Sequence, residues 1–409
     1  MKLIGPFAQI ITMDKLPLKG SINDNMLHII YDGGIIIDNE KIEALGSYDE
    51  LYTQAKNNKA IIEHIEGQQI VLPGFIDAHT HICWAGSRIN DYAQRLEGKT
   101  YVEIAKQGGG IWSTVHSTRE ADLITLEEIT ARHANQMLRD GITTIEVKSG
   151  YGLTVNDELK MLRAINNAKT KAQLIPTCLA AHICPKDFNG SANEYLNMLV
   201  EKLLPQVKTE KLAKRIDIFV DDAAFGIDEA RTYLQKARGL GFDLLVHGDQ
   251  FSTGGGKLAV ENEALSADHL EVSDEETIQD LARSNTVAVA LPGASIGLGL
   301  PFAPARKLLN AGACVAIASD WNPGSAPMGH LLAQASIIGV YEKLSIAETL
   351  AAITARAAMA LKLNHCGILK IGYTADIAAF STNDYREIIY RQGKLSPSAV
   401  WKRGIRIEI

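Results

Sequence analysis

A regular alternation of apolar runs and helix signals through the middle of the chain most limits its fold. Eight runs rich in apolar and β-branched residues follow one another over about 300 residues. They cover residues 70–79, 142–148, 173–180, 216–221, 243–247, 264–269, 286–291 and 314–319. Most are continuously apolar, which is typical of parallel strands covered by helices on both faces. This pattern predicts an α/β fold, a (β/α)8 TIM barrel over residues 70–365.

Helix start signals between these runs favour the same fold. A Ser or Thr followed three residues later by Glu occurs at residues 125–128, 273–276 and 345–348. In this capping box, the two side chains accept hydrogen bonds from backbone N–H groups at the start of a helix. A doubly wound open sheet is the alternative arrangement, but no G-x-G-x-x-G sequence follows the first strand. The barrel is therefore the favoured prediction.

Both ends of the chain have β character and lie outside the barrel pattern. Short runs of apolar and β-branched residues occur at 27–31, 35–37, 41–45, 377–380 and 404–407. Turn-forming residues such as D-G-G separate the first of these runs. We expect a small β-sandwich domain built from the N- and C-terminal segments, residues 1–69 and 366–409.

Composition excludes several classes of protein. The chain has 409 residues with 41 basic and 48 acidic side chains, and a net charge of −7 offers no basic surface to nucleic acid or anionic lipid. No signal-peptide pattern is present, and no apolar run reaches the roughly 20 residues that span a bilayer. Five cysteines without C-x-x-C spacing favour reduced thiols. We expect a soluble, cytoplasmic protein with no nucleic-acid or membrane partner.

Imidazole and carboxylate side chains gather where four of the predicted strands end. His79 and His81 end the first strand, while His247, His269 and Asp320 end the fifth, sixth and eighth. In a barrel these ends meet at one rim, where active sites lie. Alternate strand residues point the same way, so His79 and His81 face one site. Two imidazoles with a third and an aspartate match a catalytic zinc or iron that keeps an open coordination position.

The sequence around these strand ends resembles the amidohydrolase superfamily of metal-dependent hydrolases. The resemblance rests on V-L-P-G-F-I-D-A-H-T-H at 71–81, on the later His, His and Asp, and on G-I-L-K-I-G-Y-T-A-D-I at 367–377. Five further segments are similar to the branch of this superfamily that opens the imidazolone ring in histidine degradation. They are H-I-C-W-A-G-S-R at 81–88, G-G-G-I-W-S-T at 108–114, E-V-K-S-G-Y-G-L at 146–153, A-A-H at 180–182 and S-D-W-N-P-G-S at 319–325.

The resemblance implies a role for each of these positions. One metal ion per subunit, zinc or iron, would be held by His79, His81, His247 and Asp320. Asp320 would also be the general base, and His269 a catalytic imidazole that does not bind the metal. The residues that would line the substrate pocket are Arg88, Tyr151, His182, Gln250, Asn322, Gly324 and Ser325. The implied enzyme is a homodimer that hydrolyses the ring C–N bond of 4-imidazolone-5-propanoate to N-formimidoyl-L-glutamate.

Side-chain chemistry agrees with several of these implied roles. The guanidinium of Arg88 suits the propionate carboxylate of such a substrate, and Tyr151 can stack on a planar ring. Gln250 replaces a Glu found in some relatives, and its amide can bind the ring nitrogens but cannot carry a proton. Lys148 resembles the carboxylated lysine that bridges two metals in some amidohydrolases. The three-histidine set needs only one metal, so we expect a structural lysine there, and a surface position for His116.

Two other functions stay open at this stage. A mononuclear deaminase of cytosine or guanine type has a similar metal shell, but it needs an acid near the end of the fifth strand, where this chain has an amide. Release of ammonia would identify such an enzyme. A barrel that has lost its metal and acts as a scaffold is the second alternative. Metal analysis of the purified protein distinguishes it from an enzyme.

Overall fold

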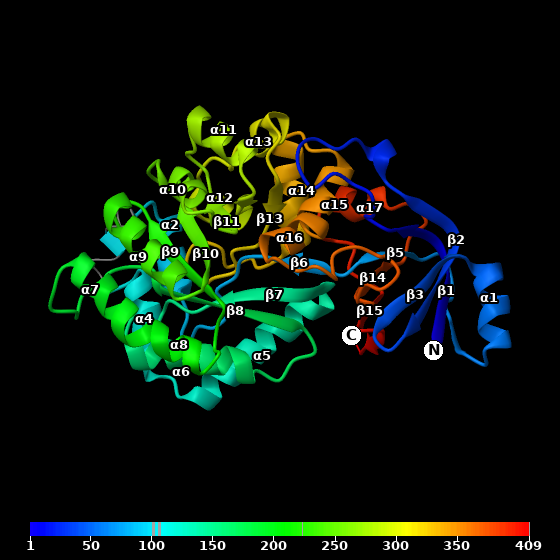
Figure 1. Ribbon diagram of the computed structural model, residues 1–409, viewed down its shortest axis with the longest axis horizontal. Helices are drawn as coiled ribbons and strands as arrows, with labels where there is room; N and C mark the ends of the chain where they lie inside the picture. Colours follow the sequence, from blue (N-terminus) through cyan, green and yellow to red (C-terminus); the bar gives the residue numbers. More distant parts are fainter. Residues whose placement is uncertain (100–102, 105–107, 223, 409) are drawn as a thin grey trace.

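Two β-sheets organise the chain in the computed structural model (Figure 1). The structure describes residues 1–99, 103–104, 108–222 and 224–408. The sheet of the central region has eight parallel strands, each paired with the one before it in the chain. These strands are β6 (Phe75–Asp77), β7 (Ile142–Lys148), β8 (Gln173–Ala181), β9 (Arg215–Val220), β10 (Asp243–Gly248), β11 (Ser266–His269), β12 (Val287–Ala290) and β13 (Val315–Ile317).

The first and last strands of this sheet meet just beyond their C-terminal ends. The backbone N–H of Asp320 donates to the carbonyl of His79, and the N–H of His81 donates to the carbonyl of Trp321, both at 3.0 Å. Thr80 and Trp321 form a parallel bridge at the same place. The predicted (β/α)8 barrel is confirmed, and its closure places the residues after β6 directly beside those after β13.

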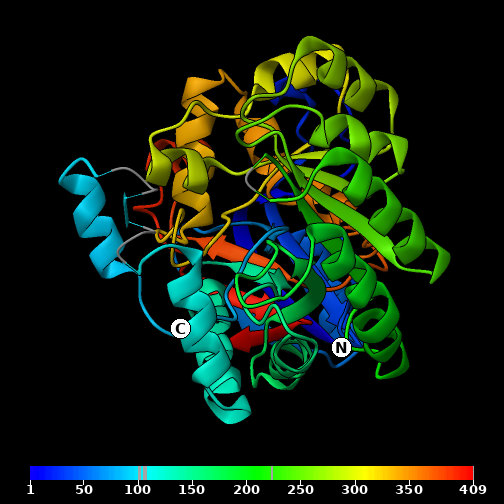
Figure 2. The ribbon, with the colours of Figure 1, turned by 90° about the vertical axis from the view of Figure 1, so that its left-hand side faces the viewer.

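Helices connect the strands and surround them (Figure 2). The first half of the barrel contains α2 (Ile89–Leu96), α4 (Ile111–Glu120), α5 (Leu123–Arg139), α6 (Val155–Asn167), α7 (Ala192–Met198), a π-helical turn (Leu199–Leu203) and α8 (Leu204–Thr209). The second half contains α9 (Ile227–Gly239), α10 (Gly255–Glu261), α11 (Glu275–Arg283), α12 (Pro292–Leu298), α13 (Ala305–Ala311), α14 (Leu331–Tyr341), α15 (Ile346–Ala352) and α16 (Ala355–Ala360). Their buried faces supply the apolar layer around the strands.

One of the three predicted capping boxes is confirmed. At 345–348 the Ser side chain accepts a backbone hydrogen bond and the Glu side chain accepts one in return, so α15 begins there. The boxes at 125–128 and 273–276 are wrong. Asp122 and Asp274 cap α5 and α11 instead, each accepting the backbone N–H three residues later. An aspartate caps a helix as well as Ser or Thr does, and each of these lies just before or inside the predicted box.

The second sheet brings the two ends of the chain together, as predicted (Figure 1). Its strands are β1 (Lys2–Ile11), β2 (Ile29–Asp38), β3 (Lys41–Ser47), β4 (Ile61–His64), β5 (Ile70–Pro73), β14 (Ile377–Phe380), β15 (Ala399–Lys402) and β16 (Ile405–Ile407). The short helices beside it are a 3-10 turn (Asp24–Met26), α1 (Tyr48–Asn57) and α17 (Arg386–Tyr390). The predicted strand 70–79 is split, because β5 pairs with β1 and β14 while β6 enters the barrel. Phe7 and Trp401, from opposite ends of the chain, pack edge to face at 6.4 Å in its core.

No helix in the described ranges combines the length and apolar character needed to cross a membrane. The domain limits 1–69, 70–365 and 366–409 stay a prediction, which we keep as a proposal.

Candidate metal and substrate site

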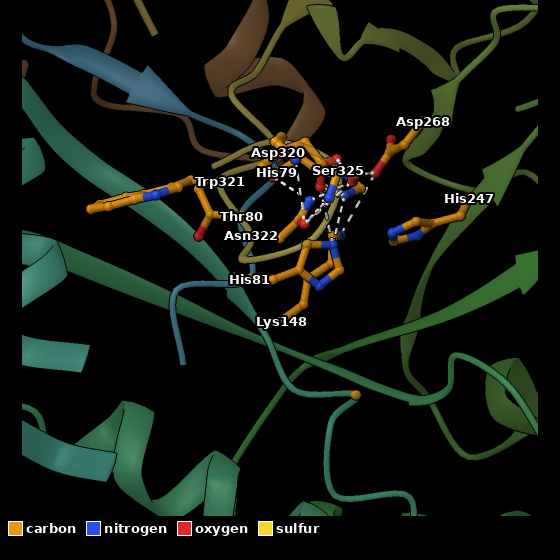
Figure 3. Close-up of polar contacts among 12 residues, drawn as sticks. His79, Thr80, His81, Lys148, His247, Asp268, Asp320, Trp321, Asn322 and Ser325 are labelled. Carbon is orange, nitrogen blue, oxygen red and sulfur yellow. Dashed lines mark hydrogen bonds and ion pairs between the residues drawn. The ribbon is translucent and has the colours of Figure 1, made fainter. Parts of the chain in front are cut away.

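Four predicted metal ligands lie together at the C-terminal ends of the barrel strands (Figure 3). Nε2 of His79 lies 3.3 Å from Nε2 of His81 and 3.6 Å from Oδ1 of Asp320. Nε2 of His81 lies 3.3 Å from the same oxygen, and the ring of His247 is 4.4 Å from that of His79 between centroids. All four side chains are buried. We call these four residues the histidine floor.

Two buried carboxylates lie next to Nδ1 atoms of the histidine floor. Oδ2 of Asp268, on β11, lies 2.6 Å from Nδ1 of His79, and Oδ2 of Asp217, on β9, lies 2.9 Å from Nδ1 of His247. The contact with His79 is a hydrogen bond, which fixes the orientation of this imidazole and leaves its Nε2 for a metal, whereas the contact of Asp217 with His247 has the distance of an ion pair without hydrogen-bond geometry. Burial alone raises the pKa of Asp217, but His247 and Lys148 together hold it below its ordinary value.

A buried lysine joins these carboxylates. Nζ of Lys148 lies 2.8 Å from Asp217, 2.9 Å from Glu146 and 3.6 Å from Asp268, and none of these side chains is exposed. Burial opposes the charge of Lys148, but the three carboxylates outweigh it and raise its pKa above the ordinary value. These neighbours match an ammonium group and would repel the extra carboxylate of a carboxylated lysine. The expected structural role of Lys148 fits this geometry.

The donor set and its surroundings fit a bound cation. Nε2 of His247 is buried and has no hydrogen-bond partner within the described part of the chain. Burial raises the pKa of both Asp77 and Asp268 to about 7, because loss of hydration penalises the charged form, and neighbouring carboxylates add a smaller effect in the same direction. The buried carboxylates of the site are Asp77, Glu146, Asp217, Asp268 and Asp320. A divalent ion at the histidine floor would offset this excess, which a single lysine does not.

Burial also keeps the floor imidazoles neutral. It lowers the pKa of His81 and of His247 to about 3, and it lowers that of His79 well below its ordinary value. Metal binding requires a neutral imidazole with a free lone pair. These three side chains are therefore in the ligating form at neutral pH before any ion binds.

Asp320 and His269 occupy unusual backbone positions. Both are non-glycine residues in the left-handed region, with φ of 51° and 84°. Such strain is found at functional sites, where the surrounding structure enforces it. Burial raises the pKa of Asp320, which suits a group that must accept a proton. Burial opposes a charge on His269, but Glu271 outweighs it, so the pKa of this imidazole is raised.

Two predicted pocket residues stack beside the floor. The ring of His182, which follows β8, lies 5.5 Å from that of His81 and within 20° of parallel. Its Nδ1 is 3.0 Å from the carbonyl of Gly150, which fixes its orientation. Tyr151 is buried, and its ring lies 5.9 Å from His81 and 5.6 Å from His182. Both side chains are placed to contact a planar ring held at the floor.

Three more predicted residues form one turn after β13. Oδ1 of Asn322 accepts backbone hydrogen bonds from Gly324 and Ser325 at 2.8 Å each, and its Nδ2 donates to the carbonyl of Asp320 at 2.7 Å. Oγ of Ser325 lies 3.4 Å from Oδ2 of Asp320. Gly324 allows the close approach of Arg88, because a Cβ there would lie 3.2 Å from a guanidinium nitrogen. The turn therefore connects the substrate side to the floor.

Arg88 is already paired in the structure. Its Nε donates to Oδ2 of Asp91, one turn further along α2, and that oxygen also accepts the backbone N–H of Gly110 at 2.8 Å. Nη1 lies 3.4 Å from Oγ1 of Thr114. The guanidinium has five N–H donors, so its outer edge can still bind a carboxylate. The pairing with Asp91 fixes the position of the guanidinium.

A cavity of about 1160 Å³ opens beside the site, and its lining includes Arg88, Trp84, Trp321 and Asn322. Gln250 is buried two residues after β10, and it has no hydrogen-bond partner in the described part of the structure. The contacts described above therefore link all the predicted site residues except Gln250. Gln250 is buried, but the described structure gives it no polar contact.

The chain is similar in sequence to known proteins of one family. The sequence pattern of the amidohydrolase family matches residues 70–406. The chain is 39% identical over 401 residues to the imidazolonepropionase of Deinococcus radiodurans, covering 98% of each chain. It is 38% identical over 408 residues to that of Symbiobacterium thermophilum, covering 98% of this chain and 96% of the relative. The chain belongs to the imidazolonepropionase family of amidohydrolases.

Solved structures show how widely this fold is shared beyond the imidazolonepropionase family. Atrazine chlorohydrolase TrzN from Arthrobacter aurescens, complexed with zinc, superimposes with a TM-score of 0.68 at 17% identity, covering 99% of this chain and 95% of that one. Aminofutalosine deaminase from Helicobacter pylori superimposes with a TM-score of 0.71 at 16% identity and covers both chains completely. At these identities the likeness shows the fold alone.

The carboxylates that contact the predicted site residues, or the lysine beside them, were not predicted from the sequence. Asp217, Asp268 and Glu146 received no role, nor did Asp91 or Glu271. A charged residue inside a continuously apolar strand is the signal that could have found the first three, because a buried charge requires a partner. No comparable signal marks Asp91, whose pairing with Arg88 depends on the path of the chain after β6.

Proposed function

We propose that this protein hydrolyses the ring C–N bond of 4-imidazolone-5-propanoate to give N-formimidoyl-L-glutamate, a step of histidine degradation. The observation that carries the proposal is the buried cluster of imidazoles and a carboxylate at the strand ends, in which ligand atoms of His79, His81 and Asp320 lie within 4.8 Å of one another, in a chain that belongs to the imidazolonepropionase family. The small-molecule substrate fits a site lined by a guanidinium and by aromatic rings.

In this proposal His79, His81, His247 and Asp320 hold one metal ion, zinc or iron. Three imidazoles and a carboxylate accept either metal. When bound, it would act as a Lewis acid and would lower the pKa of water. Asp217 and Asp268 keep the imidazoles of His247 and His79 turned toward it.

The substrate is held from the opposite side. Arg88 binds the propionate carboxylate with the edge of the guanidinium that Asp91 leaves open. Tyr151 and His182 contact the ring, and the turn that contains Asn322 closes the pocket beside Asp320. Gln250 contributes its amide as a hydrogen-bond donor or acceptor and takes no part in proton transfer.

Proton transfer uses Asp320 and His269. Oδ1 of Asp320 faces the histidines, so Oδ2 accepts a proton from the attacking water. His269 stabilises the negative charge that develops on the ring carbonyl oxygen. Asp320 then returns the proton to the ring nitrogen as the C–N bond breaks. The former carbonyl carbon becomes a carboxylate that stays bonded to the ring carbon bearing the propionate chain, the ring nitrogen is its leaving group, and one water molecule has been added.

The direct test is to mix purified, metal-loaded protein with 4-imidazolone-5-propanoate. We expect the ultraviolet absorbance of the imidazolone to disappear, N-formimidoyl-L-glutamate to appear by mass spectrometry, and no ammonia to be released. Asp320→Asn serves as the inactive control. Stable absorbance, with ammonia released from an aminopurine or aminopyrimidine instead, would contradict the proposal in favour of a deaminase.

The homodimeric state, the cytoplasmic location and the lack of nucleic-acid or membrane partners stay predictions.

A further inference from the structure

His269 has a carboxylate partner two residues along its own chain. Nδ1 of His269 lies 3.3 Å from Oε1 of Glu271, and both side chains are almost completely buried. A ring nitrogen of His269 also lies within 4.8 Å of a nitrogen of His79 and of one of His247. Because Nδ1 faces Glu271, Nε2 is the nitrogen left for the reacting atoms.

The backbone between the two side chains is held in a strained shape. His269 and Leu270 have φ of 84° and 71°, so two consecutive non-glycine residues occupy the left-handed region. Residues other than glycine seldom adopt this conformation. The N–H of Leu270 donates to the carbonyl of Gly248 at 3.1 Å, which ties this bend to the end of β10. The bend turns Glu271 back toward the imidazole that precedes it.

Glu271 is itself held from a third strand end. Its Oε1 lies 3.4 Å from Oγ of Ser295, in the helix α12 that follows β12. Its Oε2 is buried and has no partner among the residues that the structure describes. A buried carboxylate kept beside an imidazole by strained backbone is costly, and structural stability alone does not explain it. The mechanism above gives Glu271 no role.

We infer that Glu271 is a positioning residue for His269: it accepts the Nδ1–H hydrogen bond and fixes the ring so that Nε2 faces the substrate. That Nε2 faces the substrate rests on the proposed function. Among the described residues, the polar contacts of Glu271 are with His269 and Ser295 and none is with the histidine floor, and Ser295 limits the movement of its carboxylate.

Three variants separate orientation from charge. Glu271→Leu removes both the acceptor and the charge, Glu271→Gln keeps an acceptor oxygen, and Glu271→Leu combined with His269→Ala tests dependence on the imidazole. We expect Glu271→Leu to lower kcat about 10- to 100-fold, with KM and metal content changed less than about twofold. Glu271→Gln should recover most of that loss. In the His269→Ala background, Glu271→Leu should cost nothing further.

Equal losses of kcat with and without His269, or loss of the metal in Glu271→Leu, would overturn the inference. A second readout does not depend on turnover. The NMR signal of the Nδ1–H proton of His269 should shift in Glu271→Gln and disappear in Glu271→Leu, and an unchanged signal in Glu271→Leu would also overturn it. If the wild-type protein leaves 4-imidazolone-5-propanoate intact, the proposed function fails while the NMR result still decides the role of Glu271.

Discussion

The two sides of the site are built in different ways. The histidine floor comes from strand ends; a buried carboxylate on another strand hydrogen-bonds to the imidazole of His79, and a second lies 2.9 Å from that of His247. The opposite side, which we call the substrate rim, comes mostly from loops and from the start of α2. The rim consists of Arg88, Tyr151, His182, Gln250, Asn322, Gly324 and Ser325. Its best-defined parts are held by hydrogen bonds within and between loops, such as Asp91 on Arg88 and the backbone hydrogen bonds to Asn322.

This difference teaches which chemistry each side controls. In the proposed function the floor, which consists of three buried neutral imidazoles and one carboxylate, determines metal binding and turnover. The rim would contact the substrate and so determine affinity and specificity. Only the turn from Asn322 to Ser325 belongs to both, because it hydrogen-bonds to Asp320. Substitutions in the floor should therefore lower activity more than substitutions in the rim.

The largest effect is expected from His247→Ala. Its removal takes away one floor imidazole and leaves Asp217 buried without that partner. We expect metal content to fall to near zero and kcat/KM to fall about 1000-fold or more, measured by elemental analysis and steady-state kinetics. His116→Ala, whose side chain is 74% exposed, is the matched control and should change neither. Full metal content in His247→Ala would break the account of the floor.

Asp268→Asn should have the next largest effect. The change keeps the shape of the side chain but removes the charge behind Nδ1 of His79. Outer partners of this kind contribute about 10- to 100-fold to metal affinity. Competition with a chelator measures the change. An affinity equal to that of the wild type would mean that the floor imidazoles need no support.

Arg88→Ala tests the rim. Loss of the guanidinium should raise KM about 10- to 100-fold, because a charge-assisted pair with the substrate carboxylate contributes about 1.5–3 kcal/mol. The value of kcat and the metal content should change little. Arg88→Lys keeps the charge but cannot form two parallel hydrogen bonds with a carboxylate, so its KM should lie between those of the wild type and Arg88→Ala. A drop in kcat with unchanged KM would remove Arg88 from the carboxylate site.

Ser325→Ala should have the smallest effect. Its Oγ lies 3.4 Å from Oδ2 of Asp320, which is long for a hydrogen bond. It also accepts a hydrogen bond from Nδ2 of Asn322 at 2.9 Å, but Oδ1 of Asn322 still holds the turn through two backbone N–H groups. We expect kcat to fall less than about threefold and the free energy of unfolding to change by less than about 1 kcal/mol. Thermal melting and kinetics check both. A large loss of kcat would show that Asp320 is positioned by Ser325 and its turn, rather than by its contacts with His79 and His81.

Much of the floor could be predicted because parallel strands end at one face of a barrel. The positions of His79, His81, His247 and Asp320 in the sequence therefore translate directly into proximity. The same rule could not supply Asp217, because its partner His247 is on another strand and pairing depends on the register between them. The rim depends on loop paths, which strand patterns leave undetermined.

The fold shows the same limit. Eight apolar runs were enough to predict the barrel, but the Pro73–Gly74 pair inside residues 70–79, where one sheet ends and the other begins, was not recognised as a break. Gly74 stands at that point, with no space for a Cβ beside Thr143. The helix α1 was missed because the surrounding residues have β character, and α1 is stabilised by packing on β1 and β2. Tertiary contacts decided both cases.

The central claim is that one metal ion is held by His79, His81, His247 and Asp320, with His269 left free for the reaction. Anomalous X-ray scattering from crystals of the metal-loaded protein, recorded at the absorption edge of the metal, tests it most directly. We predict one peak per chain, bonded to those four side chains, with His269 unbonded and Lys148 unmodified. Two peaks bridged by Lys148, or a bond from the metal to His269, would contradict the account.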